Sequence, residues 1–490
     1  MVAGLCRWFA RQGTSVAPFK AQNMSNHSSV AVDGGEVGRA QAVQAAAAGV
    51  DVEVVMGPIL LKPSSETGSH IVVLGREVGR TDAQGWGDRS RGLRGVVLDA
   101  LTSLRCRFDV VVAEGAGGAA EINLLERDLV NLPLAHAAGV PALLVVDIER
   151  GGAFAAAHGT VDLVPEHLSA MIGGIVFNRF RGDPGLLVPG IDELTARTGV
   201  PVLGVLPQLG PDPLLGGEDS LDVPVGSVRG GGTGPDPVRV VAVRLPHLAN
   251  PSDLDPLHHE PDVALSWATG TGDLAGADVV VLPGSRATVA DLAWLRRTGI
   301  ADAIVRARSD GAVVLGICAG QQLLGRRIVD HVESGAGEVE GLGLLDVDTV
   351  FHPDKVVARR TGVAGTHRWG SHGVAGYQIH LGRACGEGAW LHLDPVVDGP
   401  AEAEGSSASE GGVLGTSVHG LLDADGLRAA LLADAADRRG RSFRPSPVRF
   451  ADRLDAQHDR LADWLDEHLD TTAVAALAST ATAPGAGPGW

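Results

Sequence analysis

The chain has 490 residues, a formal net charge of −19 and no block rich in Lys and Arg. Its length exceeds what one hydrophobic core usually serves, so we expect at least two domains. The acidic balance argues against binding to nucleic acid or an anionic membrane surface, because phosphate backbones are bound by clustered cations. No segment reaches the roughly 18 apolar residues of a spanning helix, and the first residues lack a signal-peptide core. We therefore expect a small-molecule substrate and no nucleic-acid or membrane partner.

The four cysteines, Cys6, Cys106, Cys318 and Cys385, lie far apart in the sequence and form no C-x-x-C pair. This spacing predicts neither a disulfide framework nor a structural zinc site. Free cysteines are typical of a reducing compartment, so a cytoplasmic location is expected.

The N-terminal part of the chain predicts one α/β domain over residues 1–207. Its apolar, β-branched runs alternate with helical stretches, a pattern typical of a parallel sheet covered on both faces. These runs are 110–118, 142–152, 173–180 and 201–207.

A second α/β domain is predicted over residues 238–470. Residues 208–237 are rich in Gly, Pro and Asp and lack apolar periodicity, which indicates a linker. Residues 471–490 have the composition of a disordered tail. The apolar runs of the second domain are 238–246, 277–285, 311–320 and 411–420.

Cys318 is the candidate nucleophile. In GAVVLGICAGQQLLG (311–325) an apolar strand leads into this single cysteine, and Gly320 and a helix-forming stretch follow. A strand-to-helix turn of this kind exposes a nucleophile at the carboxyl edge of a sheet and favours its thiolate at the start of the helix. A lone cysteine is otherwise most often a buried residue that ends a core strand.

A base and an oxyanion site are predicted from two further strand ends. His419 follows the run VLGTSV, and at the carboxyl edge of the sheet it could accept the thiol proton. Gly284 follows VVVLP, and its turn together with the Ala319 amide could stabilise a tetrahedral oxyanion. A surface histidine and an ordinary βα turn are the simpler alternatives.

These features together resemble the class I glutamine amidotransferases. Their G-x-C-x-G-x-Q motif matches residues 316–322. The acid that usually stands two residues after the histidine is replaced by Leu421, and the nearest carboxylate is Asp423. The resemblance is therefore to the branch that works with a Cys–His pair, which includes the enzymes that amidate cobyrinic and cobyric acids.

The segment GYQIHLG (376–382) is similar to a segment near the glutamine pocket of that branch. The resemblance implies that Gln322, Tyr377 and His380 line the pocket. Gln378 stands where an acidic residue is often found. A strand with alternating faces is the alternative interpretation of this segment.

In the N-terminal half, polar side chains gather in APFKAQNMSNHS (17–28). Lys20, Gln22 and Asn23 are candidates for binding nucleotide or corrinoid, and a solvated loop is the alternative. Glu114 ends a predicted buried strand and could hold Mg²⁺ against nucleotide phosphates. A solvent-facing acid at the strand end is equally compatible with this position.

In chain order, many stretches resemble the cobyric acid synthase family, among them VAPFKAQNMSN, LLKPSSETGS, DIERGGAFA, RLPHLANPSDLDPL and ICAGQQLLG. The resemblance implies an N-terminal domain similar to dethiobiotin synthetase, a P-loop-like parallel-sheet fold, and a C-terminal class I glutamine amidotransferase α/β domain. It also implies ATP- and glutamine-dependent amidation of the b, d, e and g carboxylates of adenosylcobyrinic acid a,c-diamide. Glutamine, ATP with Mg²⁺ and an adenosylated corrinoid are then the expected partners, without a tightly bound cofactor.

The family opens with a strand and a Gly-rich phosphate loop before the helix that matches GLCRWFARQG. Met1 falls just past that loop, and the printed sequence contains no G-x-x-x-x-G-K-[ST] motif. The expectation is that the first domain is truncated, without this loop and its strand, through a start placed too late.

Three alternatives stay open at this point. Cobyrinic acid a,c-diamide synthase shares both domain types but amidates other carboxylates. A non-catalytic corrinoid-binding or scaffold protein would account for the missing phosphate loop. A generic cysteine hydrolase would act on amides other than glutamine, without ATP.

Overall fold

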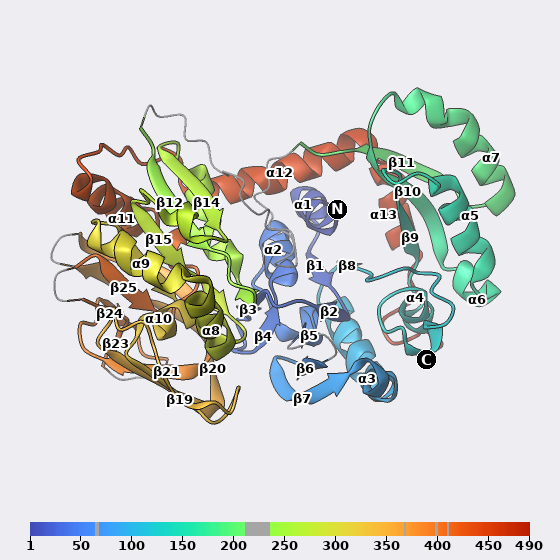
Figure 1. Cartoon of the computed structure of the whole chain (residues 1–490). Helices are drawn as coiled ribbons and strands as arrows, with labels where there is room; N and C mark the ends of the chain where they lie inside the picture. Colours follow the sequence, from blue (N-terminus) through green and yellow to red (C-terminus); the bar gives the residue numbers. More distant parts are fainter. Residues whose placement is uncertain (64–67, 211–235, 367–368, 397–399, 409–410) are drawn as a thin grey trace. The chain divides into compact units, whose positions relative to one another are not determined.

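The computed structural model describes residues 1–63, 68–210, 236–366, 369–396, 400–408 and 411–490 (Figure 1). Most of the predicted linker, residues 208–237, lies outside the described residues. The chain divides into two compact units, and both are built from α-helices and β-sheets. The first unit comprises Met1–Ser25, Val37–Leu214 and Asp455–Trp490, and the second comprises Asn26–Glu36 and Leu215–Leu454.

The first unit contains the predicted parallel strands in two sheets. One sheet pairs β1 with β8, and the other has the order β11-β10-β9. The strands carry the β-branched runs expected of buried parallel sheets, and Ile175 and Phe177 of β10 are fully buried. The strands are β1 (Val16–Phe19), β8 (Val110–Ala113), β9 (Ala142–Asp147), β10 (Ile172–Phe180) and β11 (Val202–Pro207).

Helices connect these strands. Three of them, α2, α4 and α7, end at a glycine in the left-handed conformation, which a residue without Cβ adopts without strain. The main helices of the unit are α1 (Val2–Arg11), α2 (Arg39–Ala48), α3 (Ala83–Arg105), α4 (Leu132–Ala138), α5 (Ala153–Leu163), α6 (Glu166–Ser169) and α7 (Val188–Thr198).

A mixed sheet with the order β2-β5-β6-β7 completes the first unit. Strand β2 runs parallel to β5, and the other two pairs are antiparallel. These strands were not anticipated from the sequence. They are β2 (Gln22–Met24), β5 (Ile59–Pro63), β6 (Gly68–Val73) and β7 (Arg76–Asp82).

The C-terminal residues differ from the predicted disordered tail. Residues Thr471–Ala478 form helix α13, whose Val474 is buried in an apolar cluster with Leu5, Val176 and Leu206. The alanine-rich composition that indicated a tail is also that of a good helix former once one face is covered. Residues from Asp455 onward, including most of α12 (Phe450–His468), belong to the first unit, so its sequence range differs from the predicted 1–207.

The second unit is centred on a six-stranded sheet with the order β14-β12-β15-β17-β25-β24. All pairs except β24 with β25 are parallel. Alternate residues of β12 enter two separate apolar clusters, so both faces are covered. The strands are β12 (Val238–Val243), β14 (Val263–Ala268), β15 (Val279–Leu282), β17 (Val313–Ile317), β24 (Ser406–Ser407) and β25 (Val413–Thr416).

Helices cover this sheet on its two faces. Leu292, Leu295 and Ile304 of α8 and α9 lie in one apolar cluster, and Leu427 and Leu431 of α11 lie in the other. The helices of the unit are α8 (Thr288–Thr298), α9 (Ile300–Ser309), α10 (Ala319–Leu324) and α11 (Asp425–Arg438), with the 3-10 helices η5 (Pro251–His259) and η7 (Leu421–Asp423).

Three further sets of strands belong to the second unit. A short pair joins β13 (Leu248–Ala249) to β16 (Gly284–Ser285). A second large sheet is dominated by the long antiparallel pair β20 (Val347–Thr366) and β21 (Gly370–Gly386). Its other strands are β18 (Arg327–Asp330), β19 (Gly337–Glu340), β22 (Leu391–Leu393) and β23 (Glu402–Glu404). Strand β3 (Ser28–Val30) also belongs to this unit, although its residues fall within the predicted N-terminal domain.

Candidate active site

Cys318 lies at the end of a central strand of the parallel sheet in the second unit. Strand β17 ends at Ile317, and helix α10 begins at Ala319. Cys318 has a φ of 53°, a conformation that costs energy for a residue with Cβ. Its amide donates to the carbonyl of Thr416 at 2.7 Å, which fixes the turn against β25. The sharp turn predicted from the motif is therefore present.

The glycines around Cys318 are needed for close packing. A Cβ at Gly320 would overlap the backbone carbonyl of Leu282. Helix α10 can therefore approach β15 only with glycine at this position. This contact explains the small residues in the predicted motif.

His419 follows β25 and is buried. Its Nδ1 lies 2.8 Å from Oδ2 of Asp253, and the amide of Gly420 donates to Oδ1 of the same carboxylate at 2.8 Å. Both carboxylate oxygens of Asp253 thus bond to residues His419 and Gly420. This arrangement fixes the ring and leaves Nε2 as the nitrogen available for proton transfer.

Asp253 is the functional candidate that the sequence analysis missed. A Cys–His pair without an acid was expected because Leu421 occupies the usual acidic position. The structure instead supplies a carboxylate from η5, which is 166 residues from His419 in the sequence. The structure thus places a buried carboxylate beside His419, where the sequence predicts a Cys–His pair without an acid. Only the stretch RLPHLANPSDLDPL, which contains Asp253, could have drawn attention to it.

The charge state of His419 follows from its neighbours. Burial alone lowers the pKa of His419, but the charges of Asp253 and Cys318, together with hydrogen bonds to both side chains, raise it to about 10. The imidazole is therefore protonated near neutral pH. A cation beside Cys318 favours the thiolate, which is the nucleophilic form of cysteine.

Gly284 lies next to His419. Strand β16, which contains Gly284, pairs with β13, and a Cβ at Gly284 would stand 3.3 Å from Cε1 of His419. Ala319 is the first residue of α10, directly after Cys318. Gly284, Ala319 and His419 thus follow the carboxyl ends of β15, β17 and β25, three neighbouring strands of the parallel sheet. This placement is compatible with the predicted oxyanion site.

Tyr377 packs on His419. The two rings are stacked with centroids 5.3 Å apart and an interplanar angle of 21°. Their backbones also exchange two hydrogen bonds, from Tyr377 N to His419 O and from His419 N to Tyr377 O. The Tyr377 hydroxyl accepts from Nδ2 of Asn250 at 3.4 Å. Tyr377 therefore fixes the face of the imidazole.

His380 is on β21, beyond Ile379, whose carbonyl lies 3.9 Å from the Cys318 sulfur. Its Nδ1 lies 2.9 Å from the Gly382 carbonyl, so this nitrogen must be the donor. Burial lowers the pKa of His380 to about 4, and the ring is neutral at pH 7. Nε2 is then a buried acceptor that no partner among the described residues satisfies.

Gln322 supports the same region. Its Oε1 accepts from the Thr288 hydroxyl at 3.2 Å, and its Nε2 donates to the Gly382 carbonyl at 3.4 Å. The amide group therefore connects α8, α10 and the segment that holds His380. This geometry favours a role in shaping the predicted pocket wall.

Replacing His380 by alanine is expected to raise the KM for glutamine about threefold to tenfold, because one polar contact is worth about 0.5–1.5 kcal/mol. The kcat should change less than about twofold, since a neutral His380 outside the Cys318–His419 pair is not expected to transfer a proton. Steady-state glutaminase kinetics from pH 6 to 9 would measure both, and the effect should not vary with pH, because His380 is neutral throughout. His372→Ala on the same strand is the control. An unchanged KM in His380→Ala would contradict a role in glutamine binding.

Gln378 belongs to a polar network behind His419. Its Nε2 donates to the Ser417 hydroxyl at 2.6 Å, and that hydroxyl donates to Glu404 at 2.7 Å. The Thr416 hydroxyl also donates to Glu404 at 2.7 Å. Gln378 therefore supports the backbone that leads to His419.

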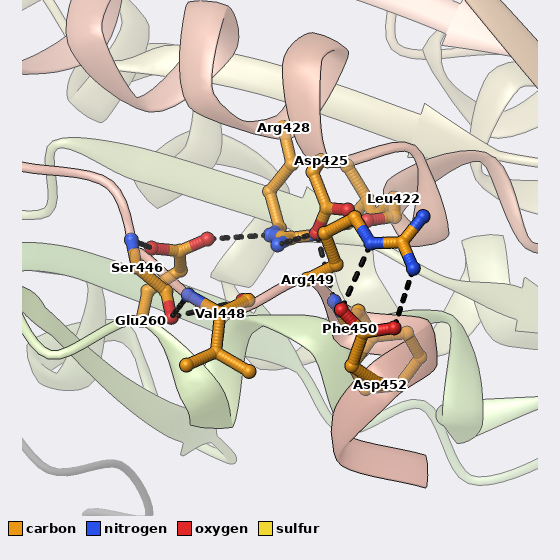
Figure 2. Close-up of polar contacts among 9 residues, drawn as sticks. All are labelled: Glu260, Leu422, Asp425, Arg428, Ser446, Val448, Arg449, Phe450 and Asp452. Carbon is orange, nitrogen blue, oxygen red and sulfur yellow. Dashed lines mark hydrogen bonds and ion pairs between the residues drawn. The ribbon is translucent and has the colours of Figure 1, made fainter. Parts of the chain in front are cut away.

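A buried arginine connects the element that bears Asp253 with the one that follows His419. Figure 2 shows Arg428 of α11 between Glu260, at the end of η5, and Asp425. Arg428 and Glu260 are both buried, and the Nε–Oε1 distance is 2.7 Å. Arg428 also donates to the Leu422 carbonyl at 2.7 Å. Through these two bonds, Arg428 fixes the position of η5 relative to η7.

Replacing Arg428 by methionine is expected to destabilise this region by about 3–5 kcal/mol, because Glu260 would remain as a buried charge without its cation. Hydrogen exchange of the η5 and α11 amides, followed by mass spectrometry, would report the loss as faster exchange. The double variant Arg428→Met/Glu260→Gln should recover part of the lost stability, because it removes the unpaired buried charge. Exchange as slow as in the unchanged chain would contradict this account.

In the first unit, Lys20 and Glu114 come together from adjacent parallel strands. Lys20 Nζ lies 2.8 Å from Oε1 of Glu114, and Gln44 of α2 donates to Oε2. The loop after Glu114 is clamped by Asn131, which bonds both the amide and the carbonyl of Ala116. Two of the residues singled out from the sequence are thus in direct contact.

Amide side chains lie nearby. Asn23 and Gln41 are buried, and both approach the position that a Cβ on Gly38 would take. Nδ2 of Asn23 and both polar atoms of the Gln41 amide lack a hydrogen-bond partner among the described residues. Gln22 precedes Asn23 on β2 and is half-buried. Buried amides with unused capacity are suited to a polar ligand.

The carboxylate of Glu114 fits a magnesium role only in part. Mg²⁺ is commonly held by one or two carboxylates together with phosphate oxygens. Among the residues that the structure describes, no group of three or more His, Cys, Asp or Glu side chains could hold a metal. Glu114 could thus supply one ligand, with nucleotide phosphates supplying others.

Comparisons with known proteins agree with the two units. Residues 239–427 match the CobB/CobQ-like glutamine amidotransferase domain, and residues 1–210 match the CobQ/CobB/MinD/ParA nucleotide binding domain. A solved glutamine amidotransferase structure aligns with 40% of this chain and 98% of its own, at 20% identity and a TM-score of 0.28. None of the helices in the described part of the chain has the length and apolar character needed to span a bilayer.

Three curated relatives are cobyric acid synthases. The one from Mycolicibacterium paratuberculosis is 49% identical, over 97% of this chain and 93% of its own. The one from Nocardia farcinica is 48% identical, over the same shares. The one from Frankia casuarinae is 46% identical, over 99% of this chain and 95% of its own.

The fold and the two matched domains define a glutamine-dependent amidotransferase, a carbon–nitrogen ligase with a nucleotide-binding domain. Within that class, the chain belongs to the cobyric acid synthase family. The predicted fold class and family are confirmed.

Proposed function

We propose that the chain hydrolyses glutamine at Cys318 and uses the ammonia to amidate corrinoid carboxylates that ATP has activated. The observation that carries this proposal is the geometry around Cys318. A cysteine on a strained turn, a protonated histidine and a buried carboxylate at 2.8 Å are the parts that thiol-dependent amide hydrolysis requires.

In the first half-reaction, the Cys318 thiolate attacks the amide carbon of glutamine. The oxyanion accepts hydrogen bonds from the backbone amides of Ala319 and Gly284, which stabilise charge that develops in the transition state. His419 gives its proton to the departing ammonia, and a glutamyl thioester remains. Gln322, Tyr377 and His380 surround the substrate glutamine.

In the second half-reaction, His419 is neutral and accepts a proton from water. The hydroxide attacks the thioester carbon, the C–S bond breaks, and glutamate leaves. The proton on His419 then restores the imidazolium beside the thiolate. Asp253 holds the ring orientation through both steps and stabilises its charged form.

ATP binds in the first unit, where it supplies the phosphoryl group that activates a carboxylate. Lys20, Gln22 and Asn23 are the residues proposed to bind ATP or the corrinoid, and Glu114 is proposed to hold Mg²⁺ against the phosphates. Lys20 contributes positive charge, and the amides contribute donors to oxygen atoms. Ammonia from the second unit then attacks the activated carbonyl and displaces phosphate.

The proposed acceptor is adenosylcobyrinic acid a,c-diamide, amidated at its b, d, e and g carboxylates. The relatives' name, cobyric acid synthase, supports this choice. Mass spectrometry of corrinoids incubated with the chain, ATP, Mg²⁺ and glutamine would test it. Stepwise amidation of the a,c-diamide is the expected result. Reaction of cobyrinic acid at only its a and c carboxylates would instead favour the a,c-diamide synthase.

A non-catalytic corrinoid-binding role is the alternative from another class. Trapping of isotopically labelled glutamine as a Cys318 thioester separates the two. The proposed function requires an adduct and released glutamate, and the absence of both would favour the binding protein.

A further inference from the structure

Asp291 is a buried carboxylate in the second unit that the proposed mechanism does not use. It lies in the first turn of α8 and is 0% exposed. Its Oδ1 lies 2.8 Å from Nδ1 of His247, and its Oδ2 accepts from the Ser285 hydroxyl at 2.6 Å. The His247 amide also donates to Oδ2, at 3.4 Å. Burial of a carboxylate costs free energy unless hydrogen-bond donors replace its water, and here these groups replace it.

The two residues that bond Asp291 hold the two strands of one short antiparallel pair. Ser285 is on β16, directly after Gly284, and His247 directly precedes β13. In the pair, Ala249 of β13 stands opposite Gly284 of β16. Asp291 therefore connects both strands to the start of α8.

The β13–β16 pair brings the glycine of the proposed oxyanion site to the histidine. A Cβ at Gly284 would lie 3.1 Å from the carbonyl oxygen of Ala249 and 3.3 Å from Cε1 of His419. Gly284 therefore has little room to shift towards either neighbour. An oxyanion donor is effective only at about 2.7–3.1 Å from the oxygen that becomes charged, so a small movement of β16 would weaken it.

We propose that Asp291 is a positioning residue for the oxyanion site, because it holds the β13–β16 pair where the Gly284 amide can stabilise the tetrahedral intermediate formed at Cys318. The inference rests on the proposed function, since it assumes that this intermediate forms. Asp291 touches no substrate in this scheme and acts through Ser285 and His247. Its contribution is therefore made in the transition state, where the oxyanion develops, more than in glutamine binding.

The test compares Asp291→Asn with Asp302→Asn. Both replacements remove one negative charge from the first turn of a helix in the second unit, but Asp302 is exposed on α9. Asparagine at position 291 turns its NH₂ group towards one of the two donors, Ser285 or His247, and cannot accept from it. We expect glutamine hydrolysis by Asp291→Asn to lose about tenfold or more in kcat, with the KM changed less than about twofold. Asp302→Asn should match the unchanged chain.

Ser285→Ala is the second, milder variant. It removes one hydroxyl from β16 and leaves the carboxylate bonded to His247. Its kcat should fall about threefold, because a single hydrogen bond is lost. If Asp291→Asn fails to fold, Ser285→Ala decides the question.

Alkylation of Cys318 by iodoacetamide separates the oxyanion site from the Cys318–His419 pair. The thiolate displaces iodide: a carbon–sulfur bond forms, the carbon–iodine bond breaks, and no oxyanion develops. The rate therefore reports the thiolate, which depends on His419 and not on Gly284. Mass spectrometry of the peptide that contains Cys318 should show a rate within about twofold of the unchanged chain in both Asp291→Asn and Ser285→Ala.

A kcat within about twofold of the Asp302→Asn value, in Asp291→Asn or, if that variant does not fold, in Ser285→Ala, would overturn the inference. Alkylation that slows in step with kcat would also overturn it, because the change would then lie in the Cys318–His419 pair. In both cases, glutamate release by the unchanged chain and its absence in Cys318→Ala would leave the proposed function standing. If the unchanged chain releases no glutamate, the proposed function fails together with the inference.

Discussion

Replacing Cys318 by alanine abolishes glutamine hydrolysis, with an expected loss of at least about 10⁴-fold in kcat, because no other group can form the thioester. Amidation supplied with ammonium should persist, since Cys318 acts only as part of the ammonia source. Glutamate release and corrinoid mass, measured on the same samples, check the two halves separately.

Cys385→Ala is the matched control for Cys318→Ala. Cys385 is a free, exposed cysteine of the same unit and should tolerate the change with full activity. Loss of both glutamine-dependent and ammonium-dependent amidation in Cys318→Ala, while its fold is intact, would contradict the two-site scheme.

Replacing Asp253 by asparagine should lower kcat/KM for glutamine hydrolysis by about 10²–10⁴-fold, in the range found when a triad carboxylate is removed. Asparagine keeps the shape of the side chain, but it lacks the negative charge that offsets the lowering of the His419 pKa by burial. The pKa of His419, raised to about 10 in the intact site, should therefore fall. Since the reactive pair needs a protonated imidazole, the alkaline limb of the pH profile should move to lower pH.

The same shift has a consequence for stability. The folded-state pKa of His419 lies above its ordinary value of 6.5, so its stabilising contribution is complete below pH 6.5 and is lost as pH rises toward 10. Asp253→Asn should remove this dependence. Asp255→Asn, in the same 3-10 helix, is the control for the kinetics. Activity of Asp253→Asn within about threefold of the unchanged chain would show that the carboxylate does not act through His419.

Cys318, His419 and Gly284 could be placed from the sequence because each follows an apolar run of one parallel sheet. Parallel strands bring their carboxyl ends to one edge, so local patterns predict which residues meet. Asp253 could not be placed in this way. It lies in a 3-10 helix without apolar periodicity, and its approach to His419 depends on tertiary packing held by Arg428 and Glu260.

Other features were missed for related reasons. The long strands β20 and β21 pair as an antiparallel hairpin. Apolar and polar residues alternate only weakly along them, so the sequence predicts a strand only around Tyr377. The alanine-rich composition of residues 471–478 predicts a tail, because it does not reveal the buried partner against which α13 packs. Residues Asn26–Glu36 could not be assigned to the second unit, because their contacts with Asn250, Tyr377 and Lys355 are all distant in sequence.

The most direct test of the account is to follow ¹⁵N from the side-chain amide of glutamine. The chain is incubated with amide-labelled glutamine, ATP, Mg²⁺ and adenosylcobyrinic acid a,c-diamide, with unlabelled ammonium as a competitor, and the corrinoid is analysed by mass spectrometry. We expect ¹⁵N in each new corrinoid amide, and its loss in Cys318→Ala, where only unlabelled amide should form. Labelled amide that still forms in Cys318→Ala, or a corrinoid that gains no nitrogen from either source with the unchanged chain, would contradict it.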